Sequence, residues 1–406
     1  MHKLSAVIIG GSHAAAQLSV SLRQEGWRGG ILIISDEHYL PYHRPPLSKT
    51  FLSGDKSIDD LLIRPAAFYE KNDIQFLNGH VIQIDRQRQI LNLADGTQVN
   101  YDKLALCTGA RVRKLAIEGA DLNGVHYVRN ATDIEAIQLK IKNVKHAVIM
   151  GGGYIGLETA ASLRKQGIQV SLIEASQRIL QRVTTPELSA FYSRIHTEEG
   201  VSIYTDLSVE RILGTTDVQG ILCSNGMTLE TDLIIVGIGV QPNVELAFEA
   251  GLHVENGVVV DPYCQTNDTH IVAAGDCTTY FNQRYQRQIR LESVPNANEQ
   301  AKIAAATLCG VSKIYNSLPW FWSDQYDLKL QIAGLNQGYD QQIIRGNMHN
   351  ERQFSVFYLK EGELIAADCI NRPLDFMVSK KIIHEQLKID VAQLADETFD
   401  LRELLK

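Results

Sequence analysis

Two glycine-rich segments of the chain have the composition and spacing of pyrophosphate-binding turns. The first is Gly10-Gly-Ser-His-Ala-Ala15, and the second, about 140 residues later, is Gly151-Gly-Gly-Tyr-Ile-Gly156. Each follows an apolar, β-branched run and precedes an amphipathic pattern, so each predicts a strand, a tight turn and a helix. In that arrangement, backbone N–H groups and a helix N-terminus meet a phosphate. The chain is therefore predicted to bind two dinucleotides.

The economical pair of dinucleotides for one chain is FAD and NAD(P)H, which predicts a flavoprotein that moves electrons. We assign FAD to the first turn, where the expected contacts are Gly10, Ser12, His13, Ala14 and Ala15. Ser12 replaces the middle glycine of the motif, and it would cost about 1–2 kcal/mol if that position needed a positive φ. Its hydroxyl is also a candidate donor to a phosphate oxygen.

An acidic residue follows the second strand of each predicted unit, where a carboxylate can accept hydrogen bonds from a ribose. In the first unit that residue is Asp36, with Glu37 as its rival and a solvated turn carboxylate as the other interpretation. In the second unit it is Glu174, which favours NADH because a carboxylate repels a 2′-phosphate. Arg178 keeps NADPH open as the alternative, since a nearby arginine pairs with that phosphate.

The composition of the 406-residue chain predicts a cytoplasmic enzyme of two or three domains. With 45% hydrophobic residues, the chain can bury large cores. A net charge of −8 disfavours nucleic acid or an anionic membrane as the main partner. No apolar run approaches the roughly 18 residues of a membrane span, and the N-terminal apolar run is a strand and not a signal peptide. Six scattered cysteines without a CxxC pair indicate neither a zinc site nor a disulfide framework.

The alternation of strand and helix patterns predicts α/β architecture up to Pro319, and a different pattern follows. After that proline we expect strands near 328–333, 341–345, 354–359 and 363–369, then a helix near 375–387. We therefore predict two Rossmann-like dinucleotide-binding domains and a C-terminal α+β domain. The expected division is an FAD-binding domain of 1–112 and 242–318, an NAD-binding domain of 113–241 and a C-terminal interface domain of 319–406.

Six motifs occur in the order of one known family. They are Pro41-Tyr-His-Arg-Pro-Pro-Leu-Ser-Lys49, Cys107-Thr-Gly-Ala110, the Gly151–Glu158 fingerprint, Ala274-Gly-Asp-Cys277, Glu292-Ser-Val-Pro-Asn-Ala297 and Pro319-Trp-Phe-Trp-Ser-Asp-Gln325. With these motifs the chain resembles the FAD-dependent NADH:ferredoxin reductases of bacterial oxygenase systems, a branch of the glutathione-reductase-like flavoproteins. The Arg-Pro-Pro-Leu-Ser-Lys element is the most specific of them.

The resemblance implies roles for residues outside the two turns. It places Lys49 near flavin N5, paired with Glu158 as the catalytic couple, and it places Trp320 and Trp322 in an aromatic wall at the flavin edge. A surface lysine and a buried interface pair of tryptophans are the alternative interpretations. The further FAD contacts that it implies are Arg44, Pro45, Lys49, Thr108, Gly109, Gly275, Asp276, Val294 and Trp322. The NAD contacts expected from the second fingerprint and the resemblance are Gly151, Gly153, Tyr154, Ile155, Gly156, Glu158, Glu174, Arg178 and Gly239.

The stretch 37–56 decides the predicted reaction class, because it contains no cysteine. Disulfide reductases and related peroxidases need a thiolate at the flavin, so those classes are disfavoured. Electrons should instead leave the flavin directly for a one-electron acceptor, a [2Fe–2S] ferredoxin. Rubredoxin is the alternative acceptor, and a flavoprotein that binds NADH but acts through partners is the alternative class. Arg284, Arg287 and Arg290 are the candidate basic patch for docking, with a solvated hairpin loop as the other interpretation.

Overall fold

The computed structural model describes residues 4–406, and their contacts divide the chain into two compact units. The first unit comprises the residues up to His43, Ile58–Arg111 and Val240–Pro319. The second comprises Arg44–Ser57, Val112–Gly239 and Trp320–Lys406. Residues 44–57, which the sequence-based division puts in the FAD-binding domain, thus cluster with the second unit. Within the described residues, no helix is long and apolar enough to cross a membrane.

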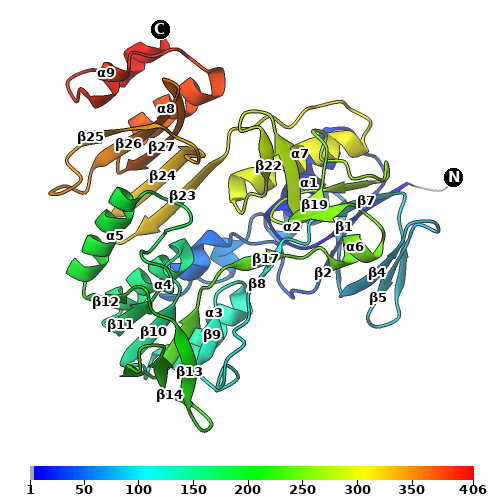
Figure 1. Ribbon diagram of the computed structural model, residues 1–406. Coiled ribbons are helices and arrows are strands. Elements are labelled where there is room, and N and C mark those ends of the chain that lie inside the picture. Colours follow the sequence, from blue (N-terminus) through cyan, green and yellow to red (C-terminus); the bar gives the residue numbers. More distant parts are fainter. Residues whose placement is uncertain (1–3) are drawn as a thin grey trace. The chain divides into compact units, whose positions relative to one another are not determined.

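The first unit is built on a five-stranded parallel sheet with the order β20-β7-β1-β2-β3. Figure 1 labels β7, β1 and β2 of this sheet. Its strands are β1 (Ser5–Ile9), β2 (Gly30–Ser35), β3 (Ile74–Asn78), β7 (Lys103–Leu106) and β20 (Ile271–Ala273). The strand order reverses between β1 and β7, and the first glycine turn follows β1. A ligand of an open parallel sheet binds at such a switch point, outside the carboxyl ends of the strands.

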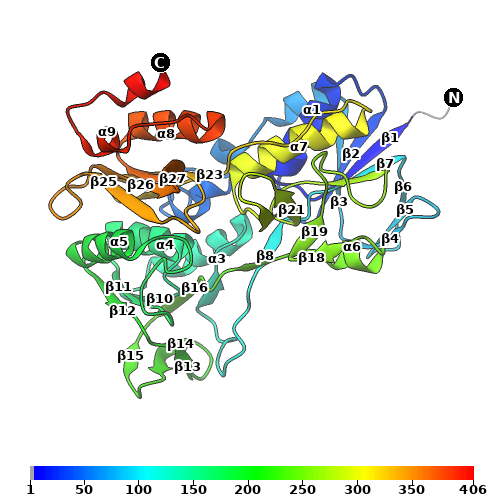
Figure 2. The same ribbon diagram turned by 45° about the horizontal axis from the view of Figure 1, so that its top comes forward.

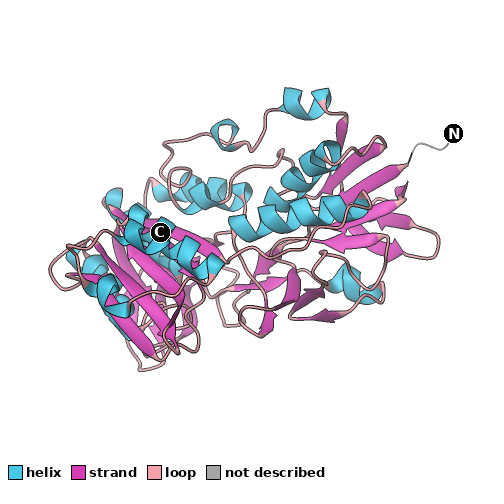
Figure 3. Ribbon diagram, turned by 90° about the horizontal axis from the view of Figure 1, so that it is seen from above, coloured by secondary structure: helices cyan, strands magenta, loops and turns pink. Residues whose placement is uncertain are grey.

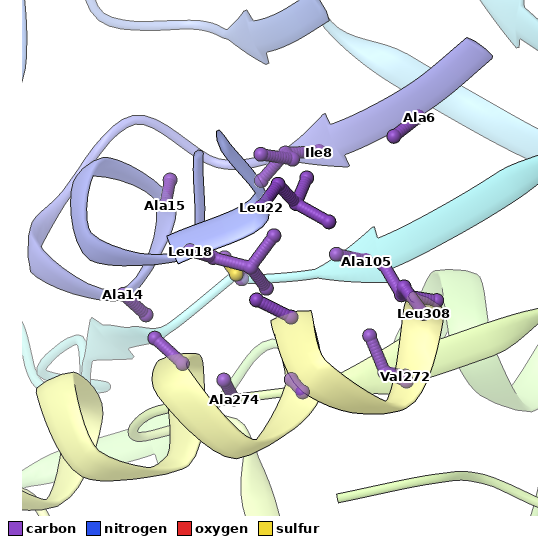
Figure 4. Packing of buried hydrophobic residues seen from close by; sticks show 14 of the residues in the cluster. Ala6, Ile8, Ala14, Ala15, Leu18, Leu22, Ala105, Val272, Ala274 and Leu308 are labelled. Atoms are coloured by element: carbon purple, nitrogen blue, oxygen red, sulfur yellow. The ribbon is translucent and has the colours of Figure 1, made fainter. Parts of the chain in front are cut away.

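Two helices pack together on this sheet and form most of its core. They are α1 (His13–Gln24) and α7 (Val294–Leu308), while α2 (Ala66–Lys71) and α6 (Glu245–Glu249) are shorter. Alanines allow the two long helices to approach closely, and Leu18, Leu22 and Ala105 are fully buried between helix and strand (Figure 4). This packing fixes where α1 begins and therefore where the first glycine turn lies.

The remaining strands of the first unit form small sheets around the parallel one. One three-stranded sheet contains β4 (Val81–Asp85), β5 (Ile90–Leu93) and β6 (Gln98–Asn100), and a four-stranded sheet contains β18 (Val254–Glu255), β19 (Gly257–Val259), β21 (Thr278–Asn282) and β22 (Arg287–Ile289). Two of the points at which the chain passes from one unit to the other lie within β8 (Ala110–Val112) and just before β17 (Val240–Pro242). A 3-10 turn, η2 (Asp59–Leu61), precedes α2.

The second unit repeats the parallel arrangement with the order β12-β11-β10-β16-β9. Its strands are β9 (Val125–Tyr127), β10 (His146–Met150), β11 (Gln169–Ile173), β12 (Val201–Tyr204) and β16 (Leu233–Val236). Its helices are α3 (Ala131–Ile141), α4 (Tyr154–Lys165) and α5 (Pro186–Glu198), with η1 (Pro45–Ser48) from the loop 44–57. A small antiparallel sheet contains β13 (Val209–Gly214), β14 (Val218–Cys223) and β15 (Thr228–Glu230). The second glycine turn follows β10, again at the switch point.

An antiparallel sheet completes the second unit, with the order β23-β24-β27-β26-β25. Its strands are β23 (Trp320–Gln325), β24 (Leu328–Gly334), β25 (Gln341–Gly346), β26 (Phe354–Lys360) and β27 (Glu363–Ile370). They are followed by α8 (Pro373–Glu385), α9 (Val391–Ala395) and η3 (Leu401–Leu405). Figure 2 shows α8 on one face of this sheet and α4 and α5 on the other.

The predicted fold class is confirmed. Both units carry a parallel dinucleotide-type sheet, and the strands of each lie together with helices beside them (Figure 3). The four strands and the helix expected after residue 328 are present within two residues of their predicted bounds. Sequence reasoning did not predict β23 (Trp320–Gln325), where the resemblance implied an aromatic wall and no strand was expected.

Candidate flavin and nicotinamide sites

The first glycine turn is shaped by contacts of backbone with backbone. Gly10 has φ +110°, and its N–H donates to the carbonyl of Ile34 at 2.8 Å. A Cβ at Gly10 would lie 2.1 Å from the carbonyl oxygen of Cys107. A Cβ at Gly11 would lie 2.5 Å from the Ser35 hydroxyl. Only glycine can hold the turn this close to the ends of β2 and β7.

Ser12 has an extended backbone, with φ −120° and ψ −157°. The strain that a positive φ would have cost therefore does not arise. Ser12 is the N-cap of α1, but its side chain does not cap the helix, and the first turn of α1 holds no acidic residue. A helix start of this kind favours an anion, since its leading N–H groups and its dipole are positive. His13, Ala14 and Ala15 follow as buried residues, and the ring of His13 lies 5.4 Å from that of His43.

The second glycine turn has the same backbone. Gly151 has φ +109°, its N–H donates to the Ile173 carbonyl at 2.8 Å, and a Cβ there would lie 2.4 Å from the Gly237 carbonyl oxygen. A Cβ at Gly156 would lie 2.1 Å from the carbonyl oxygen of Gly151. Gly153 differs, because a Cβ there would meet no atom within 4 Å. Its missing side chain leaves open space at the start of α4, which fits a dinucleotide pyrophosphate.

Glu174 is held against this turn by two backbone N–H groups. Its Oε2 accepts from Gly152 and its Oε1 from Ser176, each at 2.7 Å. Each carboxylate oxygen keeps a further lone pair for a ribose hydroxyl. Arg178 donates instead to the carbonyls of Gln181 and Thr185, at 3.2 and 3.3 Å. Its guanidinium is therefore engaged by its own loop.

Asp36 has a different setting from Glu174. Its side chain is 68% exposed and lies 3.6 Å from His80 Nδ1, while Glu37 accepts from the Tyr42 hydroxyl at 2.5 Å. The residue that follows Ile34, as Glu174 follows Ile173, is Ser35. The structure thus puts a serine at the position that the glutamate occupies in the second unit, and Asp36 lies one residue beyond it.

The other FAD candidates of the first unit belong to two tightly bonded corners. Thr108 Oγ1 donates to the Asn243 carbonyl at 2.7 Å, and the Asn243 backbone N–H donates to Gly109 at 3.0 Å. In the second corner, the Gln300 Oε1 accepts from Gly275 N–H at 2.8 Å and from Asn296 Nδ2 at 3.2 Å.

Gln300 therefore ties the Gly275-Asp276 turn to the first residues of α7. Val294 is the first residue of that helix, and the Ser293 side chain caps it by accepting from the Asn296 N–H. Asp276 contributes its backbone carbonyl to a 3.4 Å bond from Arg290.

Lys49 and Glu158 form an ion pair within the second unit, as the resemblance implied. Lys49 Nζ lies 2.5 Å from Glu158 Oε2, and the two side chains are 18% and 3% exposed. Lys49 follows η1, whose prolines set its direction, and Nζ also donates to the Pro45 carbonyl at 3.2 Å. Lys49 is thus a paired, mostly buried cation and not a solvated surface lysine.

Two serines that sequence reasoning missed also bind Glu158. Ser48 donates to Oε2 at 2.6 Å and Ser323 donates to Oε1 at 2.7 Å. Together with Lys49, these two hydroxyl groups give the buried Glu158 carboxylate polar partners. Burial of a carboxylate without such partners would be destabilising. The sequence signal that could have identified Ser323 is the alternation of side chains along β23, since Phe321, Ser323 and Gln325 share one face of that strand.

The aromatic residues of β23 divide between its faces. Phe321 contacts Tyr154 of α4, with ring centroids 5.0 Å apart. On the opposite face, Trp320 and Trp322 have centroids 5.6 Å apart, and Trp320 also contacts Phe376 of α8. Both tryptophans are half-buried. Trp322 therefore keeps exposed area, while Trp320 is also part of the packing of α8.

The remaining candidates also lie in the second unit. Arg44 donates to the Arg129 carbonyl at 2.7 Å. Ile155 is 46% exposed at the start of α4. Gly239 has φ +98°, and its carbonyl accepts from Arg113 at 3.0 Å.

The candidate docking arginines do not form one exposed patch. Arg284 and Arg287 are half-buried in the β21–β22 hairpin. Arg290 is only 12% exposed and pairs with Glu292 at 2.6 Å. The positive charge of Arg290 is therefore compensated by a neighbouring carboxylate.

All six cysteines are free thiols. Cys107 and Cys277, beside the FAD motifs, are buried, and burial raises the pKa of both thiols. They pack as neutral side chains. From Leu4 onward, no group of three His, Cys, Asp or Glu side chains is arranged to hold a metal ion.

Comparisons with known proteins match this arrangement over the full length. Residues 4–301 match the model of the pyridine nucleotide-disulphide oxidoreductases, and residues 320–405 match the reductase C-terminal domain. The chain belongs to the pyridine nucleotide-disulphide oxidoreductase family. The predicted family, fold class and enzyme class are thereby confirmed, and the family implies FAD and NAD(P)H as cofactors.

Three relatives define its branch of this oxidoreductase family. Putidaredoxin reductase of Pseudomonas putida is 42% identical, covering 98% of this chain and 96% of its own. A rubredoxin-NAD(+) reductase of Pseudomonas putida is 38% identical, covering 91% of this chain and 96% of its own. The covalent putidaredoxin reductase–putidaredoxin complex superimposes with a TM-score of 0.95 at 41% identity, covering 99% of this chain and 98% of that chain.

Proposed function

We propose that this chain is an NADH-dependent ferredoxin reductase that uses FAD and supplies electrons to an oxygenase. The observation that carries the proposal is the ion pair of Lys49 with Glu158 of α4, since Lys49 lies on the loop that in disulfide reductases would carry a redox cysteine. Bound FAD accepts a hydride at N5 and can return its two electrons one at a time, which suits a one-electron iron–sulfur acceptor. The full-length similarity to putidaredoxin reductase supports the same acceptor class.

Most of the proposed FAD contacts lie in the first unit. The turn Gly10–Ser12 and the N-terminus of α1 would hold its pyrophosphate, and Asp36 or Glu37 its adenosine ribose. The Gly275-Asp276 corner would hold the ribityl chain, beside Thr108 and Gly109 and the start of α7. Arg44, Pro45, Lys49 and Trp322 are proposed for the flavin ring. We keep 1–112 with 242–318 as the FAD-binding domain, 113–241 as the NAD-binding domain and 319–406 as the interface domain.

Lys49 would present its ammonium to the flavin, where a cation favours hydride acceptance. Glu158 keeps this cation compensated when the flavin is oxidised, and the prolines of η1 keep the loop stiff. No other titratable pair among the proposed site residues is as deeply buried in the described part of the second unit. We therefore assign the two residues to catalysis together.

NADH is the proposed donor in preference to NADPH. Two N–H groups position the Glu174 side chain beside the second turn. A 2′-phosphate placed there would meet the negative charge of that side chain. Arg178, the residue that favoured NADPH, is occupied by carbonyls of its own loop. The remaining NAD contacts proposed are Gly151, Gly153, Tyr154, Ile155, Gly156 and Gly239.

The acceptor is proposed to be a [2Fe–2S] ferredoxin, with rubredoxin as the second candidate. The rubredoxin-NAD(+) reductase similarity favours the latter, although at lower identity and coverage. A location in the reducing cytoplasm is proposed from the six free thiols.

The deciding experiment is NADH-dependent cytochrome c reduction by the purified yellow protein, alone, with a [2Fe–2S] ferredoxin and with a rubredoxin. We expect strong stimulation by the ferredoxin. Stimulation by rubredoxin alone would replace the acceptor and keep the NADH half-reaction. Flavin bleaching by NADH with neither acceptor stimulated would favour a protein that acts through partner binding. Failure of NADH to bleach the flavin of the purified protein would refute the proposal.

A further inference from the structure

A series of side-chain hydrogen bonds extends from Glu158 through the second unit. Ser323 Oγ donates to Glu158 Oε1 at 2.7 Å, and Gln325 Nε2 donates to Ser323 Oγ at 3.1 Å. His196 Nε2 lies 2.8 Å from Gln325 Oε1, and the Tyr326 hydroxyl lies 3.1 Å from His196 Nδ1. We call Ser323, Gln325, His196 and Tyr326 the Glu158 network.

Every donor in the Glu158 network points toward the carboxylate. Gln325 uses its amide N–H toward Ser323, so its oxygen faces His196, and His196 Nε2 must carry the proton. Nδ1 of the same ring then accepts from Tyr326. The direction of each bond follows from the one before it, which fixes a single tautomer of His196. Aligned bonds of this kind polarise one another and strengthen the last one.

Burial keeps the Glu158 network in this state. Ser323, Gln325 and His196 are each at most 1% exposed. Burial lowers the pKa of His196 to about 4, so its ring is neutral at neutral pH and keeps one donor and one acceptor. The network reaches half-buried Tyr326 at its far end.

The strand β23 brings these residues together. Its side chains alternate, so Ser323 and Gln325 both face α4 and α5, which carry Glu158 and His196. The C-terminal sheet thus completes a binding set for a carboxylate that the NAD-binding segment supplies.

We infer that Ser323, Gln325 and His196 are positioning residues for the catalytic pair. They hold the Glu158 carboxylate so that it fixes the Lys49 ammonium at the flavin. The inference rests on the proposed function for the role of Lys49 at the flavin. The positioning of Lys49 by the Glu158 network does not depend on the proposed function.

The test uses the purified holoprotein with Ser323→Ala, Gln325→Leu and the double variant. The first readout is acylation of the Lys49 amine at neutral pH, mapped by peptide mass spectrometry. The second is the two-electron reduction potential of the flavin. Ser323→Ala should raise Lys49 labelling about tenfold, since a hydrogen bond to a charged group is lost. It should also shift the flavin equilibrium about tenfold toward the oxidised form, which corresponds to a potential about 30 mV lower.

Gln325→Leu should act in the same direction with a smaller effect, about threefold, because it acts through Ser323. The double variant should equal Ser323→Ala, since Gln325 reaches Glu158 only through that serine. If the effects of the two single changes add, they are separate packing effects and the inference is wrong. Gln325→Leu also serves as the test if Ser323→Ala does not fold.

Ser355→Ala is the matched control. Ser355 is also fully buried on the C-terminal sheet and donates to a buried carboxylate, that of Asp375, at 2.8 Å. It should lower thermal stability as Ser323→Ala does, while Lys49 labelling and the flavin potential stay unchanged. Equal labelling in both variants would overturn the inference.

Lys49→Met distinguishes the positioning role of the Glu158 network from the proposed role of Lys49 at the flavin. If it leaves the flavin potential unchanged while Ser323→Ala raises Lys49 labelling in the wild-type background, the positioning role stands and the proposed flavin role of Lys49 fails. If Lys49→Met instead lowers the flavin potential while Ser323→Ala leaves Lys49 labelling unchanged, the flavin role of Lys49 stands and the positioning role fails.

Discussion

The two glycine turns of this molecule are alike at their first residue and differ at their middle residue, at their last residue, where Ala15 stands in place of Gly156, and at the end of the next strand. Gly10 and Gly151 share φ near +110°, the same hydrogen bond to the neighbouring strand and the same crowding by a carbonyl. Ser12 and Gly153 share only an extended backbone. The strand-end residues, Ser35 and Glu174, differ in charge.

This contrast separates two kinds of constraint. The first residue of each turn is dictated by the parallel sheet, because the strand beyond the switch point passes too close for a Cβ. The middle residue and the strand-end residue are left to the ligand. The two sites can therefore share one backbone and still select different dinucleotides.

The largest expected effect comes from Gly10→Ala and Gly151→Ala. Each puts a Cβ at 2.1 or 2.4 Å from a carbonyl oxygen at a left-handed φ, which costs about 1–2 kcal/mol before any clash. Gly10→Ala should yield protein without bound FAD, and Gly151→Ala should keep FAD but lose reduction by NADH. Flavin content and stopped-flow bleaching measure both. Loss of flavin from both variants alike would show that the turns are not independent sites.

Glu174→Ala should have the next largest effect. Loss of a carboxylate that accepts from Gly152 and Ser176 frees the turn and removes the ribose acceptor. We expect the KM for NADH to rise about tenfold or more, as for a lost charged hydrogen bond, and the preference over NADPH to weaken. Steady-state kinetics with both nucleotides measure this. Glu174→Gln, which keeps one acceptor, is the control, and unchanged kinetics in Glu174→Ala would remove this residue from the site.

Exchange of the middle residues should have a moderate effect on one site only. The Cβ added by Gly153→Ser would meet no atom within 4 Å, so folding should be unaffected, and a raised KM for NADH would report contact with the dinucleotide itself. Ser12→Gly should retain FAD and change stability by only a few tenths of a kcal/mol, since glycine is tolerated at an N-cap. Thermal unfolding and flavin content check these outcomes. A loss of FAD from Ser12→Gly would instead establish the hydroxyl as a phosphate ligand.

Much of this comparison was accessible from the sequence, because glycine spacing, apolar strands and acids at strand ends are local patterns. The C-terminal strands were equally local. What the sequence could not place were long-range partners. Ser323 meets Glu158 from 165 residues away, and only the pairing of β23 with β24 puts it there. The extended backbone of Ser12 was also undetermined, since a motif states which residue stands in a turn and not its φ.

The smallest effect is expected for Asp36→Ala. Asp36 is 68% exposed, and the imidazole of His80, itself 65% exposed, lies 3.6 Å from its carboxylate. An exposed pair of this kind contributes about 0–1 kcal/mol, so stability should barely change. If Asp36 accepts from the adenosine ribose while solvated, its removal should weaken FAD binding by about threefold, far less than Glu174→Ala weakens NADH. Titration of the apoprotein with FAD measures this, and Glu37→Gln tests the rival acid held by Tyr42. A hundredfold loss of FAD affinity in Asp36→Ala would mean that Asp36, one residue beyond the strand end, binds the ribose as strongly as Glu174 is expected to do in the second unit. The two sites would then be closer in chemistry than their geometry indicates.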